Sequence, residues 1–191
     1  MNPSFIESYL RQSSEVIASL AQQAPKIVAI VDALFAVSKA GGRLYTCGNG
    51  GSACDAMHFA EELVARYLRE RPGIRAQHLL DAGTLTCWAN DYDYASVFER
   101  QVKTLVTPAD ALIAFSTSGK SENVLAAIKA ANEIAALTIA FTGKDGGEAK
   151  NLARHFILVR SSVTSHIQEA HAALVHIVCD LLEQRLYPEC G

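Results

Sequence analysis

The sequence lacks the features that mark a membrane, secreted or nucleic-acid-binding protein. Its 191 residues contain no charge-free apolar run long enough to span a membrane, and the polar, amphipathic N-terminus lacks the apolar core of a signal peptide. The formal net charge is −3 and most basic residues are scattered, which argues against a phosphate backbone as partner. We therefore expect a cytoplasmic protein that binds neither membranes nor nucleic acid.

The five cysteines also lack the spacing of a metal site or a redox pair. None of them forms a Cys-x-x-Cys motif, and Cys47 and Cys179 fall in apolar segments, so we expect buried, reduced thiols. The sequence has no internal repeat, low-complexity run or linker, and half of its residues are apolar. This predicts one globular domain over residues 1–191, with a helical pair in 1–42 and an α/β core in 43–191.

Apolar periodicity predicts the elements of an α/β fold. Two helices, 4–22 and 26–40, precede the first strand, and a long helix at 164–187 ends the chain. The strand candidates between them are 43–47, 76–80, 111–116, 137–142 and 156–160. The helices that alternate with these strands are predicted at 53–68, 95–106, 121–134 and 146–153. Because several strands are apolar on both faces, the pattern predicts a doubly wound sandwich with a parallel sheet.

A glycine-rich turn comes directly after the first predicted strand. Residues 44–47 are apolar, 48–52 form the turn, and helical spacing begins at Ala53. This arrangement offers free backbone N–H groups and the positive end of a helix dipole to an anion. His58 and Glu62 stand at i and i+4 on that helix, which predicts acid/base or metal-ligand chemistry beside the anion; a plain surface ion pair is the alternative.

The same turn also fits the dinucleotide fingerprint G-x-G-x-x-G/A through Gly48, Gly50 and Ala53. That fingerprint requires an acidic residue at the end of the second strand. Glu70 lies before the predicted strand and Asp81 comes too late in the chain. A dinucleotide site therefore remains a second, weaker hypothesis.

A second turn, residues 116–121, carries four hydroxyl groups before a predicted helix. Its Gly-Lys-Ser sequence resembles a P-loop, but a P-loop needs glycine at position 114, where this chain has alanine. The hydroxyls and N–H groups at a helix start suit a phosphate monoester, and plain N-capping by one serine is the alternative. His166 and His171 are interpreted as core or interface residues, and Arg66, Arg69, Arg71 and Arg75 as a solvated helix end and loop.

Taken together, several segments resemble the bacterial phosphoheptose isomerases, members of the sugar-isomerase (SIS) domain superfamily. The resemblance covers nearly the whole chain in order, and the segments that carry it are 48–52, 55–63, 90–92, 116–119, 142–147 and 167–176. It implies a SIS-type α/β/α sandwich around a five-stranded parallel sheet, and a homotetramer with active sites at subunit interfaces. It also implies conversion of sedoheptulose 7-phosphate to D-glycero-D-manno-heptose 7-phosphate, the first step towards ADP-heptose and the lipopolysaccharide core.

The resemblance also implies roles for individual residues. The phosphate would be held by Ser116, Thr117, Ser118 and Ser121. Other contacts to the substrate would come from Asn49, Gly50, Gly51, Ser52, Glu62, Asn90, Asp91 and Gln168. The acid/base pair would be Glu62 and His176, and one zinc ion per subunit would be bound by His58, Glu62, Gln168 and His176. Some members carry an acidic residue three positions before Gln168, where this chain has Ser165, so any contact made by that acid is absent here.

These residues predict an aldose–ketose isomerase that works through an enediol. Glu62 would move the proton between C1 and C2, and His176 would manage the hydroxyl and carbonyl protons. Three alternatives are an isomerase for another sugar phosphate, the dinucleotide-dependent enzyme, and a non-catalytic SIS regulator that binds the bacterial replication initiator. The presence of both Glu62 and His176 argues against the regulator.

Overall fold

Five parallel strands form the central sheet of the computed structural model, which describes residues 2–190. The strands are β1 (Leu44–Gly48), β2 (Ala76–His78), β3 (Ala111–Ser116), β4 (Leu137–Gly143) and β5 (His155–Val159). Their order is β2-β1-β3-β4-β5, so the direction of winding reverses between β1 and β3. In sheets of this kind, ligands bind at the carboxyl ends of the strands on either side of the reversal.

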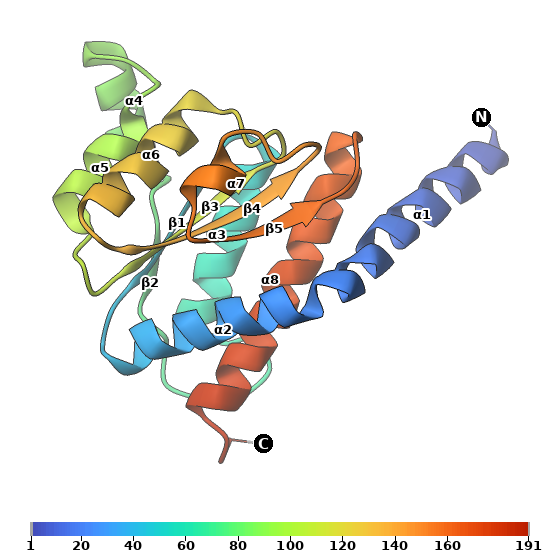
Figure 1. The fold of residues 1–191 in the computed structure, drawn as a ribbon, viewed down its shortest axis with the longest axis horizontal. Helices are drawn as coiled ribbons and strands as arrows, with labels where there is room; N and C mark the ends of the chain where they lie inside the picture. The colour runs from blue at the N-terminus through green and yellow to red at the C-terminus, as the bar shows by residue number, and fades with distance from the viewer. Residues whose placement is uncertain (1, 191) are drawn as a thin grey trace.

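Helices cover both faces of the sheet (Figure 1). One face is covered by α2 (Ala24–Lys39), α3 (Gly51–Val64) and α8 (Thr164–Leu186), which contribute to its core. Helix α1 (Pro3–Ala18) and the 3-10 turn η1 (Ser19–Gln23) come before α2 in the chain. The opposite face is covered by α5 (Val97–Leu105), α6 (Glu122–Glu133) and α7 (Ala149–Leu152), with α4 (Ala82–Asp91) at one end. The predicted sandwich is confirmed.

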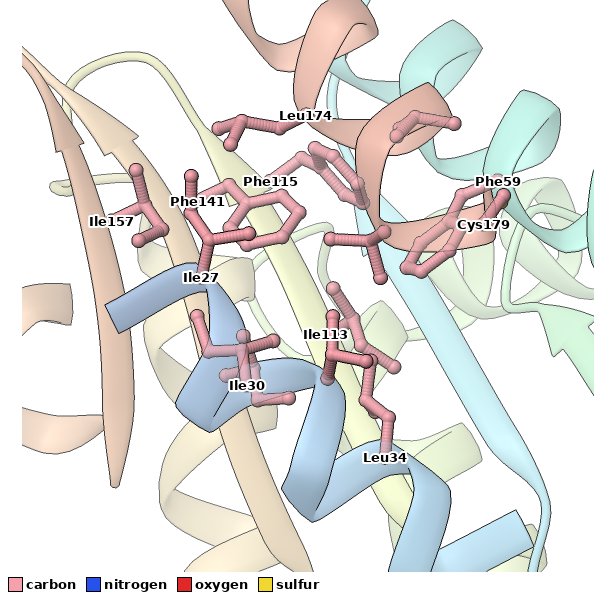
Figure 2. Packing of buried hydrophobic residues seen from close by; sticks show 14 of the residues in the cluster. Ile27, Ile30, Leu34, Phe59, Ile113, Phe115, Phe141, Ile157, Leu174 and Cys179 are labelled. Atoms are coloured by element: carbon pink, nitrogen blue, oxygen red, sulfur yellow. The ribbon is translucent and has the colours of Figure 1, made fainter. Parts of the chain in front are cut away.

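The larger core lies between the sheet and helices α2, α3 and α8. Figure 2 shows Ile27 and Ile30 of α2 directed at the aromatic side chains of the central strands, among them Phe141. Phe115 of β3 lies edge-on to both Phe141 and Phe59, with ring centroids 5.2 and 6.3 Å apart. Because these rings are fully buried, they fix α3 on the sheet and so fix where its first turn points.

Most predicted elements are present, and α4 is an addition. All five strand candidates form, although the second ends at His78. The sequence pattern predicted no helix between the strand at 76–80 and the helix at 95–106. The structure has one that begins at Ala82, with the Asp81 carboxylate accepting a hydrogen bond from the Thr84 N–H at 2.7 Å. Helix α4 has no fully buried residue, and its Leu85, Trp88 and Ala89 are only partly buried against the core.

The N-terminal helices qualify the expectation that no segment could span a membrane. The helical stretch Pro3–Lys39 is long and apolar enough by length and composition, with 28% of its apolar window buried. Core helices of soluble proteins pass the same test, and this stretch is interrupted by η1. Its second half packs on the sheet through Ile27, Ile30, Val31 and Leu34, so the feature is weak evidence for a membrane span.

Candidate active site

The first turn, residues 48–52, leads from the end of β1 into helix α3. Gly50 has a φ of 56°, a left-handed conformation that glycine adopts without strain. A side chain on Gly48 would collide with the backbone of Ser52, so the tight chain path requires glycine there as well. The turn therefore brings the backbone itself to the carboxyl edge of the sheet, where a ligand can approach the start of α3.

Asn49 links the two turns at this edge. Its side chain exchanges two hydrogen bonds with Asn123 of α6, at 2.8 and 2.9 Å, and accepts a third from the Tyr94 hydroxyl at 2.9 Å. Asn123 is buried and directly follows the first residue of α6. Neither Asn123 nor Tyr94 was predicted from the sequence, because an asparagine in the first turn of a helix and an exposed tyrosine carry no distinctive pattern.

The second turn, residues 116–121, packs against the glycines that come after β4. Gly119 has a φ of 64° and lies so close to the backbone of Gly146 that no side chain fits between them. The Ser116 and Ser121 hydroxyls are 3.3 Å apart, and the Ser121 side chain makes no capping hydrogen bond to α6. This argues against plain N-capping as the reason for the serines.

Three side chains converge on the exposed side of α3. The His58 Nε2 lies 3.1 Å from the Glu62 Oε1, and the His58 and His176 rings meet edge to face with centroids 5.0 Å apart. One ligand atom from each residue lies within 4.8 Å of the others. His176 comes from α8, more than a hundred residues along the chain, so packing of α8 on α3 assembles the predicted acid/base pair. All three residues are partly exposed.

The other predicted site residues fall at different distances from this centre. Gln168 of α8 lies against Gly51, so it reaches the first turn. Ser52 is buried at the start of α3. Asn90 and Asp91 lie on the exposed α4, where Asn90 donates to Asp91 at 2.8 Å. Within residues 2–190, hydrogen bonds do not join either of them to the two turns.

The interpretation of the arginines as solvated is wrong for Arg71. Its side chain has no solvent exposure and its Nε lies 2.8 Å from the Glu183 Oε1. Helix α8 buries this pair together with the end of α3, and charge alone in the sequence could not reveal the partner 112 residues away. Arg69 also pairs, with Asp180 at 3.0 Å.

Two further buried groups have displaced acid–base equilibria. Burial raises the pKa of Asp55 to about 6, against a smaller opposing effect of His58. Burial also lowers the pKa of His171 to about 4, although its Nε2 lies 3.3 Å from the Thr142 carbonyl oxygen. His171 and His166 are both buried, as expected of core histidines.

The three converging residues fit a divalent metal of the zinc type. Two imidazoles and a carboxylate are a common catalytic zinc set, in which the fourth position stays open. Zinc lies about 2.0–2.1 Å from such ligands, and ligand atoms within 4.8 Å of one another reach that geometry with small side-chain rotations. Gln168 would add an amide oxygen, a poor zinc ligand, if its side chain turned from Gly51.

The fold and this edge of the sheet define a class of protein: residues 8–143 match the model of the SIS domain family. Comparison with individual proteins narrows the class. The chain is 42% identical to a phosphoheptose isomerase of Clostridium acetobutylicum, over 97% of this chain and 96% of that one. It is 43% identical to the phosphoheptose isomerase of Cytophaga hutchinsonii, over 97% and 100%. The chain belongs to the phosphoheptose isomerase family, whose members are sugar-phosphate isomerases.

Solved structures agree with this assignment. A phosphoheptose isomerase from Francisella tularensis superposes with a TM-score of 0.91 at 33% identity, over 96% of this chain and all of that one. The resemblance noted in the sequence is thereby confirmed, as are the SIS-type fold and the assignment to the isomerase enzymes.

Proposed function

We propose that this chain converts sedoheptulose 7-phosphate to D-glycero-D-manno-heptose 7-phosphate through an enediol. The observation that carries the proposal is the convergence of His58 and Glu62, on the helix that follows the first turn, with His176 of α8. The family supports the reaction class, because relatives matched over nearly their whole length are phosphoheptose isomerases. In a cell the product would feed synthesis of ADP-heptose and the lipopolysaccharide core, and the enzyme would be cytoplasmic.

The second turn is the proposed phosphate site. Its groups are the hydroxyls of Ser116, Thr117, Ser118 and Ser121 and the backbone N–H groups at the start of α6. Ser118 and Ser121 are partly exposed, whereas Ser116 is buried. The Ser116 and Ser118 hydroxyls accept hydrogen bonds from the Gly119 and Lys120 N–H groups, both at 3.1 Å, and so shape the turn. Neutral donors and a helix dipole bind the phosphate here without a clustered positive charge.

The first turn and its helix hold the reacting carbons. The sugar would be contacted by Asn49, Gly50, Gly51, Ser52, Asn90, Asp91 and Gln168. Glu62 takes the proton from one of the two carbons and returns it to the other. His176 moves protons between the hydroxyl and carbonyl oxygens, for which an imidazole is suited near neutral pH. Binding of the remote phosphate holds the sugar in register for these transfers.

Zinc, one ion per subunit, is the proposed cofactor. His58, Glu62 and His176 would hold it, with Gln168 as a further oxygen donor. When bound, zinc polarises the substrate carbonyl and stabilises negative charge on oxygen. If Glu62 helps to hold the ion, its carboxylate would have to free one oxygen for the proton transfer or shift when the substrate binds.

We also propose a homotetramer. Helix α1 extends away from the sheet (Figure 1) and carries Phe5, Ile6 and Leu10 at 59–69% exposure. An apolar stripe of this kind is typical of a surface that another protein covers. Light scattering should give about four times the 20.6 kDa chain mass, and a monomer would contradict the assembly.

The direct test of the function is incubation with sedoheptulose 7-phosphate while aldose formation is monitored. The same assay with a hexulose 6-phosphate tests the alternative that another sugar phosphate is the substrate. We expect the protein to convert the heptulose phosphate alone, or to convert it at least tenfold faster than the hexulose phosphate. Absence of any turnover would favour the non-catalytic regulator that binds the replication initiator, which a pull-down with that initiator checks.

A further inference from the structure

The C-terminal end of helix α3 is held by a buried arginine. Arg71 donates from Nη2 to the Glu62 carbonyl oxygen at 2.9 Å and from Nη1 to the Leu63 carbonyl oxygen at 2.8 Å. These carbonyls belong to the last turn of α3, whose oxygens lack partners within the helix. The guanidinium thus bonds directly to the backbone of the residue proposed as the base.

Glu183 of α8 completes this arrangement. One carboxylate oxygen accepts from the Arg71 Nε at 2.8 Å and the Tyr67 N–H at 2.9 Å. The other accepts from the N–H groups of Leu68 and Arg69, both at 3.0 Å. Burial raises the pKa of Glu183, but the backbone hydrogen bonds and Arg71 outweigh it and leave the pKa below its usual value. The carboxylate stays charged with no solvent exposure.

The same loop reaches the second member of the proposed acid/base pair. The Tyr67 ring stacks on the His176 ring, with centroids 5.4 Å apart and planes 11° from parallel. His176 and Glu183 are seven residues apart on α8, which is two turns and therefore one face of the helix. Glu183 thus fixes the backbone of the residue whose ring covers His176.

We propose that Arg71 and Glu183 are positioning residues that set the distance and orientation between Glu62 on α3 and His176 on α8. The buried pair fixes three N–H groups of the loop and two carbonyls of α3 at once, directional constraints that an apolar pair of equal volume cannot supply. A buried ion pair often adds little net stability compared with apolar side chains of similar volume. We therefore attribute the Arg71–Glu183 pair to the geometry that it maintains. The inference rests on the proposed function, since it assigns these residues to that site.

Glu183→Gln is the main test, because the amide puts N–H groups where only acceptors fit. We expect kcat to fall ten- to a hundredfold with KM changed less than threefold, since small misplacement of reacting groups has effects of this size. Asp180→Asn is the matched control: it removes the partly exposed pair with Arg69 from the same helix and should leave kcat within twofold. Leu34→Ala, a core truncation in α2, controls for lost stability and should also retain kcat when folded.

A readout independent of activity separates this inference from the proposed function. The stacked Tyr67 ring should shift the ring-proton resonances of His176 upfield in protein with labelled histidine, and Glu183→Gln should abolish the shift while Asp180→Asn retains it. If Glu183→Gln abolishes the shift but the wild-type protein shows no turnover, the proposed function is wrong and the positioning of His176 by Glu183 is still supported.

The inference is overturned if folded Glu183→Gln keeps kcat within twofold of wild type, or if Leu34→Ala loses kcat equally. If Glu183→Gln fails to fold, Arg71→Lys decides, because it keeps the charge but cannot bond both carbonyls and Glu183 together. If that variant also fails to fold, Tyr67→Leu decides, because it removes only the stacked ring. Each should lower kcat about tenfold, and unchanged kcat in the deciding variant contradicts the inference.

Discussion

The first and second turns lie at the ends of neighbouring strands and differ in the helices that they lead into. The first turn runs into a helix whose partly exposed side carries His58 and Glu62, with His176 brought up by α8. The second turn runs into α6, where Asn123 and the apolar residues after it are buried. The first turn thus has reactive groups beside it, whereas the second has hydroxyls and backbone N–H groups.

Under the proposed function, this difference divides the site into a reacting half and a binding half. The two halves are joined by the Asn49–Asn123 hydrogen bonds, so a ligand that spans both turns meets one rigid surface. Changes at the first turn should therefore appear in kcat, and changes at the second in KM. Substitutions in each half, a change of pH and removal of the metal each test this division.

Glu62→Gln should lower kcat about a hundredfold or more, because the substitution removes the proposed general base. KM should change by less than threefold, since the phosphate contacts are untouched. Glu61→Gln, at the adjacent exposed position, is the control and should retain activity. A Glu62→Gln enzyme with a tenth of wild-type kcat would place the base elsewhere.

Two of the three histidines of α8 give a second contrast, because His171 is buried under the strand ends and His176 lies beside His58 and Glu62. The pKa of His171 is lowered from 6.5 to about 4, so the unfolded state takes up the proton first as pH falls. Its contribution to stability is present above pH 6.5 and is lost as pH falls towards 4, by about 3 kcal/mol.

Denaturant unfolding of wild type and His171→Gln at a series of pH values measures this effect. The difference between their free energies of unfolding should decline between pH 6.5 and 4. A constant difference across that range would show that His171 does not stay neutral in the folded state.

Ser118→Ala combined with Ser121→Ala should raise KM about tenfold and lower kcat less than threefold, because the lost hydrogen bonds act on substrate and transition state alike. Thr104→Ala, at an exposed hydroxyl of α5, serves as control. Steady-state kinetics measure both constants. Unchanged KM in the double variant would move the phosphate away from the second turn.

Removal of metal should act on the reacting half alone. Chelation should lower kcat severalfold and leave KM and the midpoint of thermal unfolding nearly unchanged, because the three ligands are partly exposed and the core does not depend on them. Metal analysis should find one zinc per chain. If the protein contains no zinc and keeps full activity after chelation, zinc is excluded as a cofactor and Glu62 and His176 act without it.

The sequence predicted the parts of the site that are local and missed those that depend on tertiary packing. The two turns and the His58–Glu62 spacing follow from short segments, because glycine and helix periodicity act locally. His176 and Gln168 were found only through family resemblance, since nothing in α8 indicates that it meets α3. Arg71 was misassigned because burial of a charge depends on a distant partner.

The fold was predicted more fully than the site. Alternation of apolar strands and helices identified the sheet, whose central strands β1, β3 and β4 are buried on both faces. Helix α4 was missed although Asp81 is a good N-cap residue and Leu85, Trp88 and Ala89 have helical spacing; none of its residues is fully buried. Apolar patterns in the sequence therefore indicate which segments are buried. They fail where a helix is mostly exposed, as α4 is, or where a charged side chain is buried, as that of Arg71 is.

Isomerisation of sedoheptulose 7-phosphate in deuterated water tests whether Glu62 transfers the proton through an enediol. If a single carboxylate transfers the proton through an enediol, and that proton exchanges with solvent on the way, deuterium should appear at C2 of the aldose product. We expect labelled product from the wild-type enzyme and a rate at least a hundredfold lower from Glu62→Gln. Absence of product from wild type, or equal labelled turnover by Glu62→Gln, would contradict the account.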